Sequence, residues 1–284
     1  MKTGLIIVNY NDYKSTKELL DNIKDYKVID KIVIVDNHSK DEEISLLKKI
    51  RNKKVKVLYL DENKGYSSAI NEGCKYLINE FGKCNIIISN SDIVINSEKD
   101  IKELLKMMLD KEIGIVAPVI LENKSLNRGW KLPRPVDEII MNFPIIGKKY
   151  YKRFMLYKEE KYIDDISEVD VVSGCFFLTK SDILKEINFL DENVFLYYEE
   201  NILSKKLKSI NKKIKINNNV IVIHNHSVTI DKNIKKINKY KLQKKSQYYF
   251  EKNYNNAKKH ELFFLNLTVK ITTILLKIKY MLGK

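Results

Sequence analysis

The strongest constraint on the fold is a short apolar run, residues 85–89, which is followed directly by Asn90-Ser91-Asp92. A run of this length without alternation predicts a strand that is buried on both faces, as in a parallel sheet. Its carboxyl end would bring Asp92 to the edge of the sheet, where open α/β sheets bind their ligands. A carboxylate at that edge can hold a divalent cation, and the cation can hold a diphosphate.

The rest of the first half repeats this pattern, because short apolar runs alternate there with helical periodicity. Strands are predicted at residues 5–8, 31–35, 55–60, 85–89 and 113–117, and helices at 15–25, 45–49, 66–81 and 98–111. Such alternation predicts an α/β fold with a Rossmann-like, mostly parallel central sheet and helices on both faces. Right-handed crossovers then place the polar strand ends Asn9, Asp36, Asp61 and Asp92 along one edge.

The pattern breaks down between residues 119 and 167, where three prolines, Trp130 and many tyrosines occur. A long irregular segment of this kind, with a short helix or two, is typical of functional lids and binding segments. Strands are expected again at 169–173, 176–179 and 220–223, with a helix at 199–210 between them.

The positive charge is concentrated at the carboxyl end. Residues 232–284 carry 14 Lys against 2 Glu, which is most of the net charge of +15. We therefore expect a nearly neutral globular domain at residues 1–231 and a basic helical tail at 232–284. Such a tail suits an anionic membrane surface or a nucleic acid, or it is a solvated face without a partner.

The three cysteines are odd in number and match no zinc spacing. They indicate a reducing, cytoplasmic compartment. The first eight residues are too short in their apolar part for a signal peptide. We also see no uncharged apolar stretch of the ~20 residues that span a bilayer.

Several polar residues after the predicted strands could bind a nucleotide. Asp36 could hydrogen-bond a base or ribose, or it could simply cap the next element. Lys64 and Gly65 open a helix whose free N–H groups suit a diphosphate, although an ordinary strand-to-helix turn has the same appearance. Asn71, in that helix, could face the nucleotide or be solvated.

Asp92 could ligate Mg²⁺ or Mn²⁺ together with phosphate oxygens and water, with Asn90 orienting it or touching the ribose. Asn-Ser-Asp is also common turn chemistry. His224, which ends its strand, could complete a metal site or contact phosphate, and His226 follows it. These residues do not form a zinc pattern.

Glu199 and Glu200 follow an aromatic run and are candidates for a general base, because partial burial raises a carboxyl pKa toward neutrality. The simpler interpretation is that both favour the macrodipole in the first turn of a helix. A dinucleotide fingerprint, a P-loop and a nucleophile elbow are all missing from the sequence, which argues against the corresponding enzyme classes.

Taken in order, these motifs resemble those of family 2 glycosyltransferases over roughly residues 4–230. The closest similarity is to the rhamnosyltransferase-like branch that builds bacterial surface polysaccharides, such as capsules. The matching segments are Ile-Ile-Val-Asn-Tyr-Asn (6–11), Val-Asp-Asn-His-Ser (35–39), Asn-Lys-Gly-Tyr-Ser-Ser-Ala-Ile-Asn (63–71), Asn-Ser-Asp (90–92), Val-Ser-Gly-Cys-Phe-Phe-Leu (172–178), Leu-Asp-Glu-Asn-Val-Phe-Leu-Tyr-Tyr-Glu-Glu (190–200) and His-Asn-His-Ser (224–227).

The resemblance implies a GT-A fold and a metal-dependent enzyme that transfers a sugar from a UDP- or dTDP-linked donor, with inversion. Asn9 and Asp36 would then lie at the nucleotide, and Asp92 and His224 at the metal and diphosphate. Glu200 falls where the family places its catalytic base. Gly174 would approach the donor sugar or the acceptor, and Trp130 would help to shape the acceptor cleft.

Two positions depart from the family pattern: Asn90 opens the metal motif, and Glu200 replaces the usual Asp. They leave open an alternative, a catalytically weak scaffold that binds nucleotide sugars and uses the basic tail to reach a membrane.

From residue 262 onward, apolar residues recur at steps of three and four. They are Phe264, Leu267, Ile271, Ile274, Leu275, Ile278 and Leu282. This spacing with basic flanks predicts an interfacial membrane helix, whereas the alternative is packing on the body or on a second copy in a homodimer. No nucleic-acid module is recognisable. A growing glycan on a lipid would place the enzyme peripherally on the inner face of the plasma membrane.

Overall fold

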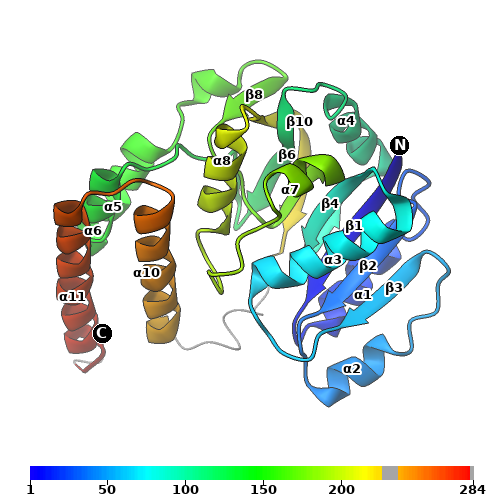
Figure 1. Ribbon diagram of the computed structural model, residues 1–284, viewed down its shortest axis with the longest axis horizontal. Coiled ribbons are helices and arrows are strands. Elements are labelled where there is room, and N and C mark those ends of the chain that lie inside the picture. The colour runs from blue at the N-terminus through cyan, green and yellow to red at the C-terminus, as the bar shows by residue number, and fades with distance from the viewer. Residues whose placement is uncertain (226–235, 282–284) are drawn as a thin grey trace.

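The computed structural model describes residues 1–225 and 236–281, as a sheet covered by helices on both faces (Figure 1). His226, the predicted domain boundary at 231/232, and Leu282 lie outside the described residues. Within the described part of the chain, no helix combines the length and the apolar character that crossing a bilayer requires.

The first half is built from strands and helices in alternation, as predicted. The elements are β1 (Lys2–Asn9), α1 (Tyr13–Ile23), β2 (Lys31–Asp36), α2 (Asp41–Leu47), β3 (Val55–Tyr59), α3 (Tyr66–Phe81), β4 (Cys84–Asn90), β5 (Ile93–Ile95), α4 (Glu98–Met107) and β6 (Ile113–Glu122). The central strands are buried along nearly their whole length, which explains why they read as continuous apolar runs.

The second half contains more irregular structure. It comprises β7 (Ser125–Asn127), α5 (Pro135–Met141), α6 (Pro144–Tyr150), a π-helical turn η1 (Tyr151–Met155), a 3₁₀ turn η2 (Glu159–Tyr162), β8 (Ile166–Val169), β9 (Phe176–Lys180), α7 (Ser181–Glu186), α8 (Glu199–Ser209), β10 (Lys213–His224), α10 (Lys236–Asn253) and α11 (Lys259–Met281). The short helices expected within residues 119–167 are therefore present.

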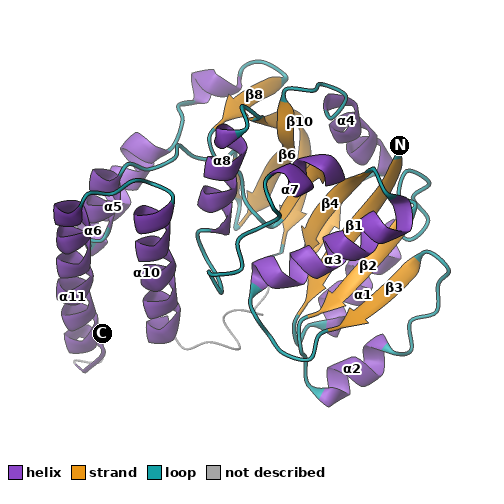
Figure 2. Ribbon diagram, in the orientation of Figure 1, coloured by secondary structure: helices purple, strands orange, loops and turns teal. Residues whose placement is uncertain are grey.

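The strands form one mixed sheet in the order β3-β2-β1-β4-β9-β6-β10-β5 (Figure 2). The predicted parallel arrangement holds for β3-β2-β1-β4 and for the pair β6 and β10. In contrast, β9 runs antiparallel between β4 and β6, and β5 runs antiparallel to β10 at the edge. The sheet is therefore mixed, and β9 is the antiparallel strand at its centre.

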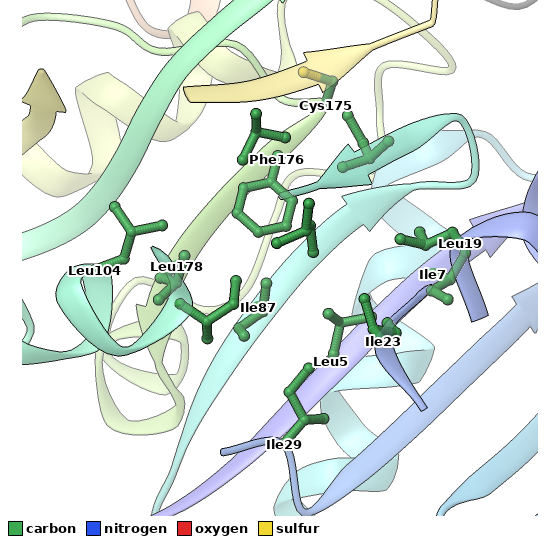
Figure 3. Close-up of a cluster of buried hydrophobic side chains, with 14 of the residues drawn as sticks. Leu5, Ile7, Leu19, Ile23, Ile29, Ile87, Leu104, Cys175, Phe176 and Leu178 are labelled. Carbon is green, nitrogen blue, oxygen red and sulfur yellow. The ribbon is translucent and has the colours of Figure 1, made fainter. Parts of the chain in front are cut away.

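Two hydrophobic clusters sandwich the sheet. On one face, α1 and α4 cover the side chains of alternate strand residues, including Leu5, Ile87 and Phe176 (Figure 3). On the other face, α3, α7 and α8 pack against the intervening residues, including Ile6 and Ile86. Each strand thus contributes its side chains to both faces in turn, and the two layers fix where the strand ends lie.

The carboxyl-terminal helices lie beside α5 and α6, at the end of the molecule opposite the first strands (Figure 1). A third, smaller hydrophobic cluster joins them to the body, because Phe250 of α10 packs with Val194 and Ile202. The tail is therefore in direct contact with the start of α8.

Candidate active site

The strand ends of β1 and β2 meet in a buried hydrogen-bond network. Asn9 and Asp36 are both fully buried, and Asn9 Nδ2 donates to Asp36 Oδ1 at 2.7 Å. Ser39 N donates to Asp36 Oδ2 at 3.1 Å, and Thr16 Oγ1 donates to Asn9 Oδ1 at 2.8 Å. The structure thus brings these two predicted nucleotide residues together and holds them in one conformation.

The turn into α3 contains a glycine with φ of +105°, Gly65. A Cβ at this position would lie 2.4 Å from the carbonyl oxygen of Phe195, so the close approach of residue 195 requires glycine. Beside it, Asn37 Nδ2 donates to the Gly65 carbonyl, while Asn37 Oδ1 and Ser67 Oγ are buried without a hydrogen-bond partner among the described residues. Unpaired buried polar atoms at a helix amino end fit a polar ligand or ordered water.

The structure does not bring Lys64 and Asn71 into this group. The Lys64 ammonium is exposed and lies 2.9 Å from Glu62. Asn71 is buried, but its Nδ2 donates to the Leu190 carbonyl and to Glu192 Oε1, and its Oδ1 accepts from Leu190 N. Its side chain therefore links α3 to the segment before α8. Sequence periodicity placed Asn71 in the correct helix without showing which way the side chain points.

Asp92, His224 and Glu122 converge at the edge formed by β5, β6 and β10. His224 Nε2 lies 3.3 Å from Asp92 Oδ1, and His224 Nδ1 lies 3.6 Å from Glu122 Oε2. Burial opposes protonation of the imidazole, but the two carboxylates together raise the His224 pKa above its ordinary value. The parallel pairing of β10 with β6 brings His224 and Glu122 to the same strand end.

Glu122 was missed at the sequence level because the strand was expected to end at residue 117, whereas β6 continues to Glu122. An acidic residue at the end of an apolar strand is the signal that marked Asp36. The same signal marks Glu122 once the strand is extended to its observed end. A carboxylate behind a metal-ligating imidazole orients the ring and increases its basicity.

The donor set fits a divalent cation that is shared with a ligand. Within the described ranges, no group of three His, Cys, Asp or Glu side chains could hold a metal ion. Asp92 and His224 supply one oxygen and one nitrogen, so the remaining positions would come from diphosphate oxygens and water, as is usual for Mg²⁺ bound with substrate phosphates.

Tyr66 lies between Asn90, at the end of β4, and Gly174, whose backbone N–H bonds Glu200. Its hydroxyl donates to Asn90 Oδ1 at 2.7 Å and lies 3.0 Å from the Gly174 carbonyl oxygen. Burial, with the nearby acidic groups of Cys175, Glu200, Glu199 and Asp92, raises the Tyr66 pKa well above its usual range. No sequence signal had marked this hydroxyl, since Tyr66 reads as the first residue of a helix.

Glu199 and Glu200 begin α8 but have different surroundings. Glu200 lines a pocket of about 650 Å³, and its Oε1 accepts a hydrogen bond from Gly174 N at 3.1 Å. Glu199 is 7% exposed, and its Oε1 has no hydrogen-bond partner within the described chain. Burial raises the pKa of both, and the charge of Glu200 raises the Glu199 pKa further. Of the two carboxyl groups, Glu200 lines the pocket and Glu199 does not.

The pocket beside Glu200 is built by segments far apart in the sequence. Trp130, Tyr197 and Tyr198 contribute aromatic surface, and the Trp130 indole donates to Asn201 Oδ1 at 3.2 Å. Met141, Pro144 and other residues of α5 and α6 line it, together with Tyr240, Gln243 and Lys244 of α10 and Thr272 and Leu276 of α11. The structure thus brings Trp130, Gly174 and Glu200 together, and it adds the tail helices to the same pocket.

Comparison with known proteins identifies relatives over most of the chain. Residues 5–187 match the sequence model of glycosyl transferase family 2. Over 201 residues the chain is 25% identical to the low-salt glycan biosynthesis hexosyltransferase Agl10 of Haloferax volcanii, covering 69% of this chain and 58% of that protein. The chain therefore spans less than two thirds of this relative's length.

Two solved structures share the fold at 14% identity and a TM-score of 0.59. One is GalNAc-T7 with UDP, GalNAc and Mn²⁺, matched over 81% of this chain and 44% of the other. The second is the mannosyltransferase PcManGT from Pyrobaculum calidifontis in complex with GDP-Man and Mn²⁺, matched over 96% and 72%. These similarities confirm the GT-A architecture that was expected from the sequence.

Proposed function

Because this chain belongs to glycosyl transferase family 2, we propose that it transfers a hexose from a nucleoside diphosphate sugar to a hydroxyl group of a growing glycan, with inversion. The observation that carries this proposal is the position of Glu200. Its side chain lines the pocket, and its Oε1 accepts a hydrogen bond from Gly174 N. A UDP- or dTDP-linked donor is expected, and rhamnose remains one candidate sugar.

The donor would bind along the strand ends of β1, β2 and β4. Asn9 and Asp36 would shape the nucleotide site, and the unpaired atoms of Asn37 and Ser67 would meet polar groups of the donor. Asp92 and His224 would hold Mn²⁺ or Mg²⁺. When bound, the cation would supply positive charge that neutralises the leaving diphosphate.

Glu200 would act as the general base. Burial raises its pKa toward the range in which a carboxylate removes a proton efficiently. The acceptor hydroxyl, held in the pocket, would lose its proton to Glu200 as its oxygen attacks the anomeric carbon. The bond to the diphosphate oxygen breaks on the opposite face of the sugar, so one displacement inverts the configuration. Trp130 and the tyrosines would offer flat surfaces for the acceptor sugar.

A lipid-linked acceptor and peripheral membrane binding are supported by α11. Its buried face consists of Leu265, Thr268 and Thr272, and two of these hydrogen-bond Asn142 of the segment after α5. Most of its other large apolar residues face outward, with Phe263, Ile274 and Leu275 between 50% and 63% exposed. An apolar face that the body does not cover, on a basic helix, suits an anionic membrane.

A donor screen tests the proposed function. UDP- and dTDP-sugars would be tested with Mn²⁺ or Mg²⁺ by thermal shift, and the stabilising donors would then be assayed for nucleotide release with glycan acceptors. We expect metal-dependent stabilisation and acceptor-dependent release. Donor binding with no release in any combination would favour the scaffold function, and the lack of any donor binding would contradict both.

A further inference from the structure

The segment that leads into α8 has an unusual backbone. Tyr197 and Tyr198 have φ values of 72° and 71°, so two consecutive tyrosines adopt the left-handed conformation. Residues with a Cβ adopt it rarely, and they keep it only where surrounding contacts enforce it. Glu199 follows directly, and Glu200 is the next residue, so this turn sets the direction from which both carboxylates enter the site.

The contacts that enforce the turn come largely from α10. Ser246 Oγ donates to the Leu196 carbonyl at 2.8 Å. The Phe250 ring lies against the Tyr198 ring, with centroids 5.6 Å apart. Gln247 acts through a buried carboxylate, because Gln247 Nε2 and the Tyr198 hydroxyl both donate to Glu138 Oε2, at 2.5 and 2.8 Å.

These three residues belong to the buried face of α10, together with Glu251, which is 0% exposed. Ser246, Gln247 and Phe250 are 3%, 1% and 0% exposed, and their spacing puts them on one helix face. Lys241 and Lys245 on the same helix are exposed. The buried face of α10 is therefore directed at the turn before α8, beside which the helix lies in Figure 1.

The turn is coupled to the position of the Glu200 carboxylate. On the far side, Gly174 N donates to Glu200 Oε1, and a Cβ at Gly174 would lie 2.8 Å from that oxygen. A small rotation at the start of α8 would lengthen this hydrogen bond, and errors near 1 Å in a catalytic group are costly.

We propose that Gln247, Glu138 and Tyr198 are positioning residues, through which the carboxyl-terminal helix α10 holds the left-handed turn and fixes the carboxylate of Glu200. The proposal rests on the proposed role of Glu200 as the base. It makes α10 a working part of the active site rather than an appendage, although none of the three residues accepts the substrate proton.

The Gly174 amide offers a readout that does not depend on activity. Ser173-Gly174 is the only Ser-Gly pair in the sequence, so labelling with carbonyl-¹³C serine and ¹⁵N-glycine selects this amide in an NMR spectrum of the full chain. We expect Gln247→Leu and Tyr198→Phe to shift this signal and to weaken its response to pH. Lys245→Ala, an exposed change on the same helix, should leave it unchanged.

Kinetics provide the second readout. For Gln247→Leu, which does not reach the pocket lining, we expect kcat to fall by about 10- to 100-fold. Donor affinity should be unchanged, and the apparent pKa on the acidic side of the pH–rate profile should change. A purely structural role would lower the melting temperature without altering the pH profile of the folded enzyme.

The outcomes separate the two proposals. An unchanged Gly174 signal in both Gln247→Leu and Tyr198→Phe would overturn the positioning role, whatever the activity. Should Gln247→Leu fail to fold, Tyr198→Phe decides alone, since it removes a single oxygen. Full transfer by Glu200→Gln would instead overturn the assignment of the base, and the NMR result would still show whether α10 positions that carboxylate.

Discussion

The polar residues at the ends of the first strands and those at the start of α8 are fixed in different ways. At the ends of β1 and β2, Asn9 and Asp36 bond to each other and to residues within about one βαβ unit. At the start of α8, Glu200 is held by Gly174 and by a turn that contacts α10, some 50 residues further along. The first arrangement follows from the local strand–helix order, whereas the second depends on contacts between distant segments.

This difference suggests a division of labour. The proposed donor half is fixed by the sheet itself, and the proposed acceptor half is assembled from α5, α6, α8 and the two tail helices around one pocket. Substitutions in the two halves should therefore have separable effects on donor binding and on transfer.

The largest effect is expected from Glu200→Gln. Loss of the general base should lower kcat by about 10³-fold while donor binding stays near normal, measured by single-turnover kinetics and calorimetry. In the wild-type enzyme the rate should rise with pH through the raised pKa of Glu200 and level off above it, because the base must be ionised.

Glu199→Gln is the matched control for that change. Since Glu199 does not line the pocket that Glu200 lines, glutamine at this position should leave most of the transfer intact. The assignment is wrong if Glu199→Gln abolishes transfer and Glu200→Gln does not.

In the donor half, Asp92→Ala should reduce metal-dependent donor binding by about 10²-fold, since it removes one of two candidate protein ligands. Titration with the donor in Mn²⁺ and in EDTA would measure this. Asp165→Ala, a change in the loop before β8, is a suitable control. If Asp92→Ala binds donor as tightly as wild type in Mn²⁺, the metal is held elsewhere.

A smaller effect is expected for Glu122→Gln, which leaves both candidate ligands in place. Loss of the carboxylate behind His224 should weaken Mn²⁺ affinity by about 10- to 100-fold. Manganese titration by electron paramagnetic resonance would show it. An unaltered affinity would mean that Glu122 does not orient the imidazole.

The smallest effect on sugar transfer is expected from substitutions in α11. Replacing Ile274 and Leu275 by serine should reduce binding to anionic vesicles by about tenfold, because each contributes exposed apolar surface. Transfer to a soluble acceptor should be unaffected. If vesicle binding is unchanged but a dimer dissociates in sedimentation, the exposed face of α11 binds a second copy instead.

Local patterns were sufficient to predict the alternating elements of the first half and the strand ends at Asn9, Asp36 and Asp92. They were insufficient for β6 and β10, whose length depends on their pairing with each other, and so Glu122 was missed. The antiparallel β9 was not foreseen, because strand direction is set by the connections and not by the apolar run itself.

The site shows the same limit. The carboxylate pair at 199–200 was visible as an acidic helix start. Which of the two lines the pocket depends on the turn before α8, where Tyr198 contacts Phe250 and Glu138, residues that lie far away in sequence. Similarly, periodicity predicted the apolar residues of α11, while the pairing of Thr268 and Thr272 with Asn142 determines that these apolar residues face outward.

The most direct test of the central claim is the anomeric configuration of the transferred sugar, determined by proton NMR as the product forms in Mn²⁺ and in EDTA. We expect an inverted configuration, one nucleoside diphosphate released for each bond formed, and no product in EDTA. A retained configuration, or transfer at full rate in EDTA, would contradict a single displacement driven by Glu200 on a metal-bound donor.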